Sequence, residues 1–590
     1  MQSAVPDHNN KASSGRDALG PKIERHLESI YGEVSAGLAE RLMDIMDYPD
    51  TVAPKTPYQN HWDETDAIVI TYANSVTSED EKPLHTLHTF FSTHLKDAIN
   101  TIHILPFFPY SSDDGFSVIN YRQVNESWGD WADIESIAQE CKLMSDLVIN
   151  HCSARSEWFQ QFKRHEAPGR DFFFTANPDE NLEQVVRPRT SPLLKLVETT
   201  AGPRHVWCTF SHDQVDLNFA NTELLAEMVA IIAFYLNRGV RLFRLDAIAF
   251  LWKVPGTSCL NLPQTHELVR LFRTLIEHHT ADALIITETN IPNRENLAYF
   301  GNGNEAHMIY NFALPPLLLH AMVTGNAQYL RNWLMSMPPA QDGTTYLNFI
   351  ASHDGIGLRP VEGILTEAET TQLLETMEQF GGRISWRNLS SQTMKPYEIN
   401  ISLFSALQGT VEGVDEWQVA RFLCAHAIML ALEGVPALYI HSLTATPNDQ
   451  KKVGYTGNNR SINRHVWHRN ELDALLQDAE STSAVVLRSL KQLLNIRQAQ
   501  PAFHPNATQY TLHLGADLFA FWRQSRRREQ SIFCVHNITP RPASFHLGGL
   551  NLVETNDWFD LISGRVFRDF DEEVHLQPYQ TLWITNFHND

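Results

Sequence analysis

Cysteine is scarce in this chain, with six residues among 590. The six are scattered, without the spacing that paired or metal-binding cysteines show. In a chain of this length we expect free thiols, which are consistent with a cytoplasmic location. We accordingly expect no metal site and no bound cofactor.

Basic residues are also few relative to acidic ones, so that the formal net charge is −23. A broad positive field for nucleic acid or an anionic membrane is therefore excluded, although a small anionic substrate can still bind to local charge. No apolar run approaches the roughly 20 residues of a membrane span. The polar start MQSAVPDHNNKASSGRDALG has no apolar core of a secretory signal. We expect a cytoplasmic protein with small-molecule partners, and a homodimer stays open.

A glycine-rich phosphate loop is missing after the first β-rich run, which argues against an open doubly wound sheet. Eight apolar, β-rich runs alternate with helical patterns, as expected for parallel strands buried on both faces. They cover 66–76, 101–111, 142–152, 240–250, 283–290, 306–314, 345–354 and 435–442. These patterns predict an α/β fold, a (β/α)8 TIM barrel.

The chain is too long for one compact core, so we expect a large domain with attachments. Residues 1–60 form a polar tail and a helical extension, 61–500 the barrel, and 501–590 a small antiparallel β domain in this prediction. Two intervals inside the barrel are too long for simple loops. We interpret about 153–216 as an inserted subdomain and about 355–434 as a second insertion.

Charged residues interrupt the core-like run GVRLFRLDAIAF. Arg244 and Asp246 are two residues apart, so they share one face of a strand and can both point into the mouth of the barrel. Glu288 ends the next strand and Asp354 ends a later one. Because barrel enzymes carry their catalytic groups at the carboxyl ends of strands, we expect these three carboxyl groups to converge.

Two of these carboxyl groups suit the cleavage of a glycosidic bond. Arg244 keeps Asp246 ionised, and an ionised carboxylate is a usable nucleophile. Burial or negative neighbours can keep Glu288 protonated, as a general acid requires. A pair about 5–5.5 Å apart would give a covalent glycosyl-enzyme and retention of configuration. On its own, the pairing of Arg244 with Asp246 could equally be structural.

Four stretches, DLVINH, VRLFRLDAI, ITETN and FIASHD, resemble the conserved motifs of the α-amylase-type glycoside hydrolases. The resemblance covers the barrel and the order of its motifs. It implies that Asp246 is the nucleophile, Glu288 the acid/base and Asp354 the residue that stabilises the transition state, with Arg244 orienting Asp246. Asn150 matches a residue that helps bind calcium in some amylases, but we expect a hydrogen-bonding role and no metal.

Two further stretches, LPFFPYSSDDGFSVINYRQVN and GNNRSINRH, look like the sucrose phosphorylase branch of this family. That resemblance implies a closed pocket for one glucosyl unit. Asp113 and Arg464 would hold the far hydroxyls, Phe116 would form an aromatic platform, and His151 and His353 would bind the ring. Taken alone, a histidine such as His151 is more often a core residue.

The same branch transfers the glucosyl unit to inorganic phosphate, which needs local positive charge. Arg189 matches the phosphate-binding arginine of the branch and Arg187 lies beside it, although both could instead brace the inserted subdomain. Tyr397 and Glu398 fall where the branch has a Tyr-Gln pair on a mobile acceptor loop. The glutamate is a departure, as is Phe250 in place of a tyrosine, and both put sucrose itself in doubt.

The region RISWRN…MKPYEIN more closely resembles relatives acting on glucosylglycerate or glucosylglycerol. Arg383, Arg387 and Lys395, each a plausible solvated loop charge, could pair with a glycerate carboxylate, which favours glucosylglycerate. We therefore predict a retaining glucoside phosphorylase that forms α-glucose 1-phosphate, with phosphate as co-substrate. The alternatives are a sucrose phosphorylase, a hydrolase or transglucosidase on sucrose or short α-glucans, and a barrel that only binds sugar.

Overall fold

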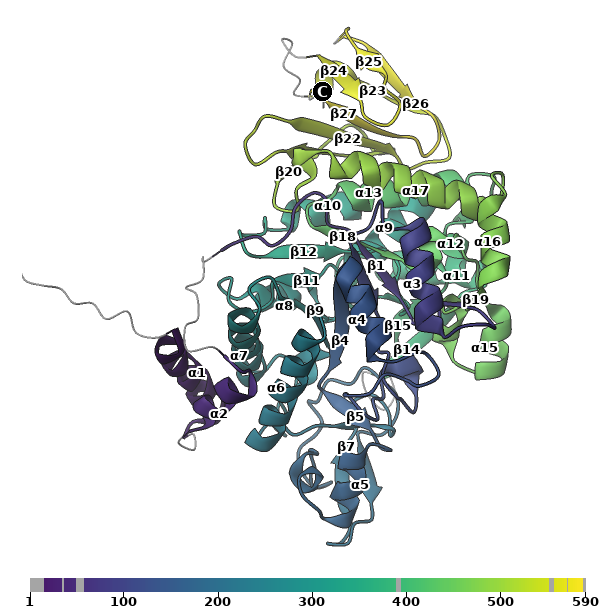
Figure 1. Ribbon diagram of the computed structural model, residues 1–590. Coiled ribbons are helices and arrows are strands. Elements are labelled where there is room, and N and C mark those ends of the chain that lie inside the picture. Colours follow the sequence, from purple (N-terminus) through teal and green to yellow (C-terminus); the bar gives the residue numbers. More distant parts are fainter. Residues whose placement is uncertain are drawn as a thin grey trace, which may run out of the picture.

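Eight parallel strands close into a barrel in the computed structural model, which describes residues 15–33, 37–48, 58–388, 394–550, 557–569 and 571–586. Each strand pairs with the next in chain order, and the last pairs with the first (Figure 1). The strands are β1 (Ile68–Thr71), β3 (Thr101–Ile104), β4 (Lys142–Val148), β9 (Val240–Asp246), β10 (Leu284–Thr287), β11 (Met308–Tyr310), β12 (Thr345–Asn348) and β18 (Val435–Tyr439). The predicted (β/α)8 barrel is confirmed.

Helices cover the outside of the barrel, and α6 (Thr222–Asn237) shows why they form where they do. The Asn221 side chain accepts a hydrogen bond from the Glu223 amide and so caps the first turn. After the helix, Gly239 has a φ of 90° and packs so closely that a Cβ there would lie 2.7 Å from Ala138. Only glycine fits this turn into β9. None of the described helices has the length and apolar character that a membrane crossing requires.

The chain between β4 and α6 forms an inserted lobe, residues 151–216, below the barrel in Figure 1. Its first strand, β5 (His151–Ser153), pairs antiparallel with its last, β8 (Gln214–Asp216). Between them lie α5 (Glu157–Arg164) and a hairpin of β6 (Leu194–Val197) and β7 (Arg204–Trp207). Because β5 follows directly after β4, the lobe begins at the carboxyl end of a barrel strand.

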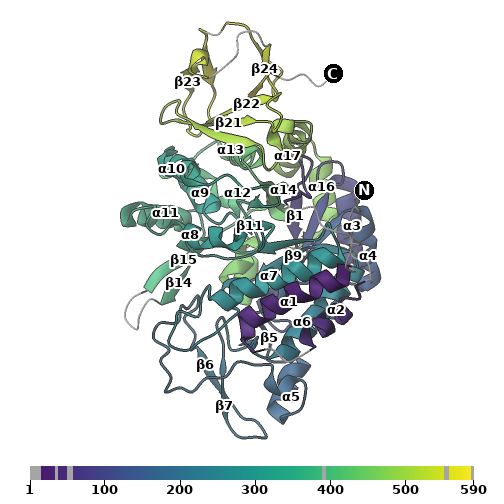
Figure 2. The ribbon, with the colours of Figure 1, turned by 90° about the vertical axis from the view of Figure 1, so that its left-hand side faces the viewer.

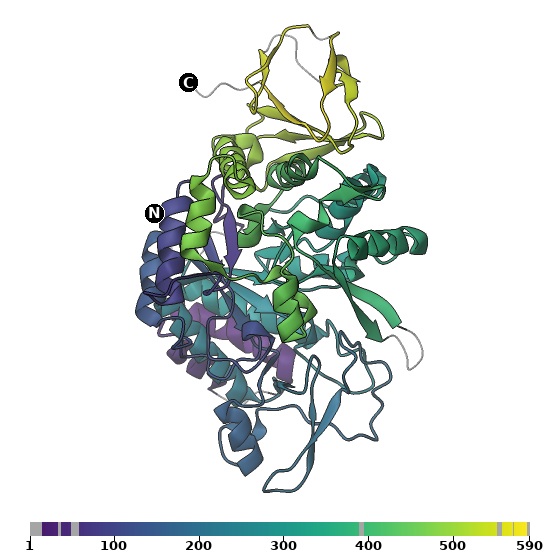
Figure 3. The same cartoon turned by 90° about the vertical axis from the view of Figure 1, so that its right-hand side faces the viewer.

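The second insertion follows β12. Its strands are β13 (Ile356–Gly357), β14 (Arg383–Asn388) and β15 (Met394–Asn400), and β15 lies between the other two. Helix α11 (Glu367–Gln379) precedes the β14–β15 hairpin. Figures 2 and 3 show the hairpin extending from the barrel toward the inserted lobe. The two insertions therefore flank the same end of the barrel.

The C-terminal part is an antiparallel sheet that lies over α13 (Gln418–Ala431) and α17 (Thr482–Gln498) (Figure 1). Its side chains alternate between two faces. Phe519 and Phe521 join the main core of the protein, whereas Ala520 belongs to a separate core of the C-terminal part. The six strands are β20 (Thr508–Leu512), β21 (Leu518–Gln524), β22 (Ser531–Asn537), β27 (Thr581–Thr585), β24 (Trp558–Asp560) and β25 (Val566–Phe567).

Two N-terminal helices, α1 (Gly15–Tyr31) and α2 (Leu38–Ile45), pack on the outside of the barrel. Figure 2 shows α1 lying along α7 (Pro263–His279). The His26 Nδ1 contacts the Glu267 carboxylate at 2.5 Å across this interface. Because α7 is the helix that precedes barrel strand β10, the N-terminal extension packs against a helix of the barrel itself. Residues 1–14 of the predicted tail lie outside the described residues.

A buried ammonium group joins the inserted lobe to the barrel. The Lys253 side chain is 1% exposed, and its Nζ lies 3.0 Å from the Asp216 carboxylate, 3.0 Å from the Asn150 Oδ1 and 3.0 Å from the Phe250 carbonyl. These oxygens come from the last strand of the lobe, the end of β4 and the turn after β9. One cation therefore fixes three segments at the mouth of the barrel.

We expect Lys253→Met to lower the free energy of unfolding by about 3–5 kcal/mol, because it leaves the Asp216 carboxylate buried without its cation. Thermal unfolding measures the loss. Lys451→Met, at an exposed lysine, should unfold like the wild type. A wild-type unfolding temperature in Lys253→Met would contradict this role for Lys253.

Candidate active site

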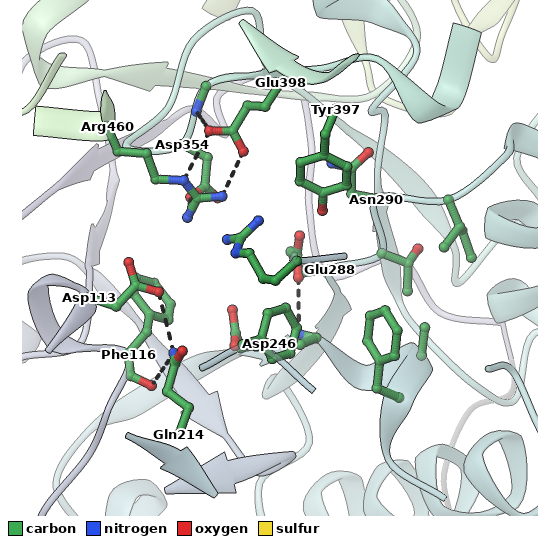
Figure 4. A pocket seen from close by; sticks show the side chains of 18 of the residues that line it. Asp113, Phe116, Gln214, Asp246, Glu288, Asn290, Asp354, Tyr397, Glu398 and Arg460 are labelled. Carbon is green, nitrogen blue, oxygen red and sulfur yellow. Dashed lines mark hydrogen bonds and ion pairs between the residues drawn. The ribbon is translucent and has the colours of Figure 1, made fainter. Parts of the chain in front are cut away.

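A cavity of about 760 Å3, including its open mouth, lies between the carboxyl ends of the barrel strands, the inserted lobe and strand β15 (Figure 4). Most of the residues singled out from the sequence line it. They are Asp113, Phe116, His151, Arg189, Asp246, Glu288, His353, Asp354, Tyr397 and Glu398. Three arginines singled out with them, Arg187, Arg244 and Arg464, do not line the cavity.

Arg244 lies just beneath the floor of the cavity. Its Nη1 donates to the Asp246 Oδ1 at 2.7 Å and also to the Asp146 Oδ1, and its Nη2 is 3.9 Å from the Glu288 carboxylate. The other oxygen of Asp146, Oδ2, lies 2.7 Å from the His103 Nε2. The side chains of Asp146 and His103 are fully buried. This chain of bonds fixes the guanidinium, and through it the carboxylate of Asp246.

Burial raises the pKa of both central carboxyl groups, Asp246 and Glu288. Burial and the negative charges of Asp246 and Asp354 raise the pKa of Glu288 to about 7, against the opposing charge of Arg244. Burial also raises the pKa of Asp246, but the direct bond from Arg244 favours its ionised form. Glu288 accepts a hydrogen bond from the Ala247 amide at 3.0 Å, which fixes its orientation. The geometry therefore suits an ionised Asp246 beside a protonated Glu288.

Asp354 forms an ion pair with Arg460, whose Nη1 lies 2.5 Å from its Oδ1. The same guanidinium donates to both oxygens of Glu398, at 3.0 and 2.7 Å (Figure 4). Glu398 is 2% exposed and also accepts from the Gly355 amide at 3.0 Å. Burial alone would raise the pKa of Asp354, but the nearby cations, first Arg460, hold it well below its usual range. Arg460 thus links β15 to the third carboxylate.

Aromatic and amide groups form the end of the cavity predicted to hold glucose. The Phe116 ring stacks on His353, with centroids 5.0 Å apart and planes 5° apart. The Gln214 Nε2 donates to the Asp113 carboxylate at 3.3 Å and contacts the His151 Nε2 at 3.2 Å. Burial lowers the pKa of both histidines, to about 3 for His353, which favours the neutral form of each ring.

Arg464 supports this end of the cavity from behind. Its Nη1 donates to Asp114 at 2.7 Å, its Nε donates to the His353 carbonyl at 2.8 Å, and it comes only within 4.0 Å of Asp113. Arg460, four residues earlier in the same motif, is the arginine that lines the cavity. Of these two arginines, Arg460 lines the cavity and Arg464 lies behind its wall.

The arginines of the inserted lobe have different surroundings. The Arg187 Nη2 donates to the Ser191 carbonyl, within the lobe. Arg189 does line the cavity, and its guanidinium lies over the rings of Phe210 and Tyr397, 5.8 and 5.5 Å from their centroids. Of the two, only Arg189 is placed to meet a ligand.

The polar or aromatic cavity-lining residues that sequence reasoning missed include Phe210, Gln214, Asn290 and Arg460. Asn290 ends the stretch ITETN, so its place at a strand end was available as a signal. Phe210 and Gln214 belong to the lobe, whose path the sequence did not reveal. Phe250, noted as a departure, lines the cavity and packs edge-on against Phe210 with centroids 5.5 Å apart.

The basic residues of the β14–β15 hairpin were weighed as solvated loop charges or as partners of a glycerate carboxylate, and the structure places them outside the cavity. The Arg387 Nη2 donates to the Glu362 carboxylate at 2.7 Å. Arg383 and Lys395 are exposed, and none of the three lines the cavity. A bound carboxylate in the cavity needs another cation.

Known proteins resemble this chain over most of its length. The α-amylase catalytic-domain family matches residues 94–355. The chain is 39% identical to the glucosylglycerate phosphorylase of Allomeiothermus silvanus, over 97% of this chain and 100% of that protein. It is 38% identical to the glucosylglycerate phosphorylase of Escherichia coli, over 95% and 99%. Against the glucosylglycerol phosphorylase of Marinobacter adhaerens the identity is 30%, over 71% and 85%.

The fold also has solved counterparts. The crystal structure of sucrose 6F-phosphate phosphorylase from Thermoanaerobacter thermosaccharolyticum superimposes with a TM-score of 0.70 at 24% identity, over 80% of this chain and 94% of that one. At this identity the likeness establishes the shared barrel architecture.

We expect kcat/KM for an α-glucoside to fall as the pH rises through about 7, because Glu288 loses the proton that the leaving oxygen requires. α-Glucosyl fluoride tests the assignment, since fluoride leaves without a proton. Its pH profile of kcat/KM should lack the decline on the basic side. The same decline with both donors would remove Glu288 as the acid.

We expect Glu398→Gln to slow glucosyl transfer about tenfold or more, since a hydrogen bond to a charged group contributes about 1.5–3 kcal/mol. The loss should be equal for every acceptor, because Glu398 acts through Arg460 on Asp354. Glu362→Gln, which breaks the ion pair between Glu362 and Arg387 outside the cavity, is the matched control. A loss confined to one acceptor would show instead that Glu398 contacts that acceptor.

Proposed function

Because the chain belongs to the α-amylase family, in the branch of the sucrose, glucosylglycerol and glucosylglycerate phosphorylases, we propose that it is a glucosylglycerate phosphorylase. Membership of this branch makes it an enzyme that transfers a glucosyl unit to phosphate. The observation that carries the choice of substrate is the extent of the match. Glucosylglycerate phosphorylases match at 38–41% identity over 89–97% of the chain, whereas the sucrose phosphorylase of Streptococcus mutans matches at 27% over 74%.

In the proposed first step, the glucosyl unit moves from the substrate to the enzyme. An Asp246 oxygen attacks the anomeric carbon while the bond from that carbon to the glycerate oxygen breaks. Glu288 gives its proton to the departing oxygen, so that glycerate leaves with a hydroxyl group. The product is a glucosyl ester of Asp246 with inverted configuration. Asp354, held ionised by Arg460, would bind sugar hydroxyls and stabilise the transition state.

In the second step, phosphate collects the glucosyl unit. A phosphate oxygen attacks the anomeric carbon, the ester bond breaks, and Asp246 becomes a carboxylate again. Glu288, now ionised, takes a proton from the phosphate group and is ready for the next cycle. Two inversions give α-glucose 1-phosphate with the original configuration. Water competes for the same ester, so a closed cavity favours phosphate.

The proposed chemistry needs no cofactor, because proton transfer and a covalent ester are within reach of carboxyl groups. Phosphate is a co-substrate. All six cysteines are free thiols, and five of them are buried. This pattern supports a proposed cytoplasmic location, where thiols stay reduced. A homodimer stays a prediction.

We expect glucose 1-phosphate to appear only when phosphate is added, and fastest from glucosylglycerate among that substrate, glucosylglycerol and sucrose. Asp246→Asn should reduce the rate about 10^4-fold or more, as the loss of a nucleophile does in other enzymes. Enzymatic measurement of glucose 1-phosphate and free glucose separates the products. Free glucose at equal rates with and without phosphate would identify a hydrolase and refute the proposal.

A further inference from the structure

The acceptor end of the cavity offers few cations to an anionic ligand. Among the cavity-lining residues, the arginines are Arg189 and Arg460. Arg460 already binds two carboxylates, Asp354 and Glu398, so its charge is more than balanced. Arg189 forms no ion pair with any carboxylate in the described part of the chain. Its positive charge is therefore available.

The surroundings of Arg189 hold its guanidinium without using its hydrogen bonds. The centroids of the Phe210 and Tyr397 rings lie 5.8 and 5.5 Å from its Cζ, and an aromatic face attracts a guanidinium without accepting a conventional hydrogen bond from its N–H groups. Its hydrogen bonding with described residues is limited to a long contact of 3.4 Å with the Pro188 carbonyl. A planar, unpaired guanidinium suits bidentate binding of a carboxylate or a phosphate.

Retention of configuration places both acceptors at the same point. The glycerate oxygen leaves from the face of the sugar that the phosphate oxygen later attacks, so the two reacting oxygens occupy one position in turn. In phosphate, the charged oxygens are two bonds from the reacting oxygen; in a hydroxy acid that reacts through the hydroxyl beside its carboxylate, they are three bonds away. The negative charge of the carboxylate and that of the phosphate therefore lie in the same small region of the cavity.

We propose that Arg189 forms one anion subsite that binds the carboxylate of the hydroxy-acid acceptor in one half of the reaction and phosphate in the other. This inference rests on the proposed function and extends it. The carboxylate and phosphate therefore cannot bind at the same time. The same residue makes the enzyme prefer a charged acceptor to a neutral polyol. Arg189 is then a specificity-determining residue as well as a phosphate contact.

One further arginine is an alternative candidate to bind the carboxylate of the acceptor. Arg359 is 8% exposed and its charge acts on Tyr397, but it does not line the cavity. The rival arrangement has two sites, with phosphate on Arg189 and the carboxylate on Arg359. The two arrangements differ in which variant loses which acceptor.

The test uses α-glucosyl fluoride as donor, because its leaving group carries neither carboxylate nor phosphate. Transfer to phosphate, glycerate, glycerol and water is measured for the wild type, Arg189→Gln, Arg189→Lys, Arg359→Gln and the control Arg204→Gln, an exposed arginine of the same lobe. In Arg189→Gln we expect kcat/KM for phosphate and for glycerate to fall about 100-fold each, as expected when one partner of a charged pair is removed. Transfer to glycerol and hydrolysis should stay within about threefold of the wild type, and Arg189→Lys should recover part of both losses.

Three results would overturn the inference. One is a loss confined to phosphate in Arg189→Gln, with the loss of glycerate transfer appearing in Arg359→Gln. Another is an equal loss for all four acceptors, which would assign Arg189 to the glucosyl half of the reaction. The third is an Arg204→Gln enzyme with the same losses. A wild type that transfers to glycerol and water but not to phosphate would instead refute the proposed function.

Discussion

The buried guanidinium of Arg244 is the group on which the rest of the site depends. It lies at the end of a core strand, where an unpaired charge would be costly, and it is balanced by Asp146 on one side and Asp246 on the other. Because β4 and β9 are neighbouring barrel strands, the pair Asp146–Arg244 also ties the two strands together. The same charge sets Asp246 apart from Glu288: it bonds the first directly and lies 3.9 Å from the second. One cation thereby gives the proposed nucleophile and the proposed acid different surroundings.

A second arrangement of charges extends this control to the acceptor end. Arg460 holds Asp354 and Glu398 at once, so the position of β15 and the ionisation of a barrel carboxylate are coupled. Lys253 does the same for the inserted lobe, since it binds Asp216 of the lobe and the turn that follows Asp246. Both insertions are therefore anchored to the barrel through buried ion pairs, whereas Arg189, at the cavity wall, pairs with no carboxylate among the residues that the structure describes.

The sequence predicted the parts of this protein that follow from strand periodicity. Parallel strands buried on both faces have continuous apolar sequences, and their carboxyl ends meet at one end of the barrel. The positions of Asp246, Glu288 and Asp354 at the ends of such sequences were therefore enough to group them. The choice between Arg460 and Arg464 could not be made in this way, because both lie in one short motif and only the path of the η6 turn (Asn459–Asn463) decides which faces the cavity. The partner of Arg387 could not be predicted for a similar reason, since Glu362 lies 25 residues earlier in the chain.

The most direct test of this account is to identify the residue that carries the glucosyl unit. Glu288→Gln should still react with α-glucosyl fluoride but should discharge the ester slowly, since it lacks a base. Rapid quenching, digestion and mass spectrometry should then find one added hexosyl unit on the peptide that contains Asp246, and added phosphate should remove it faster than water does. An adduct on another residue, or none at Asp246 while fluoride is released, would contradict the assignment of Asp246 as nucleophile.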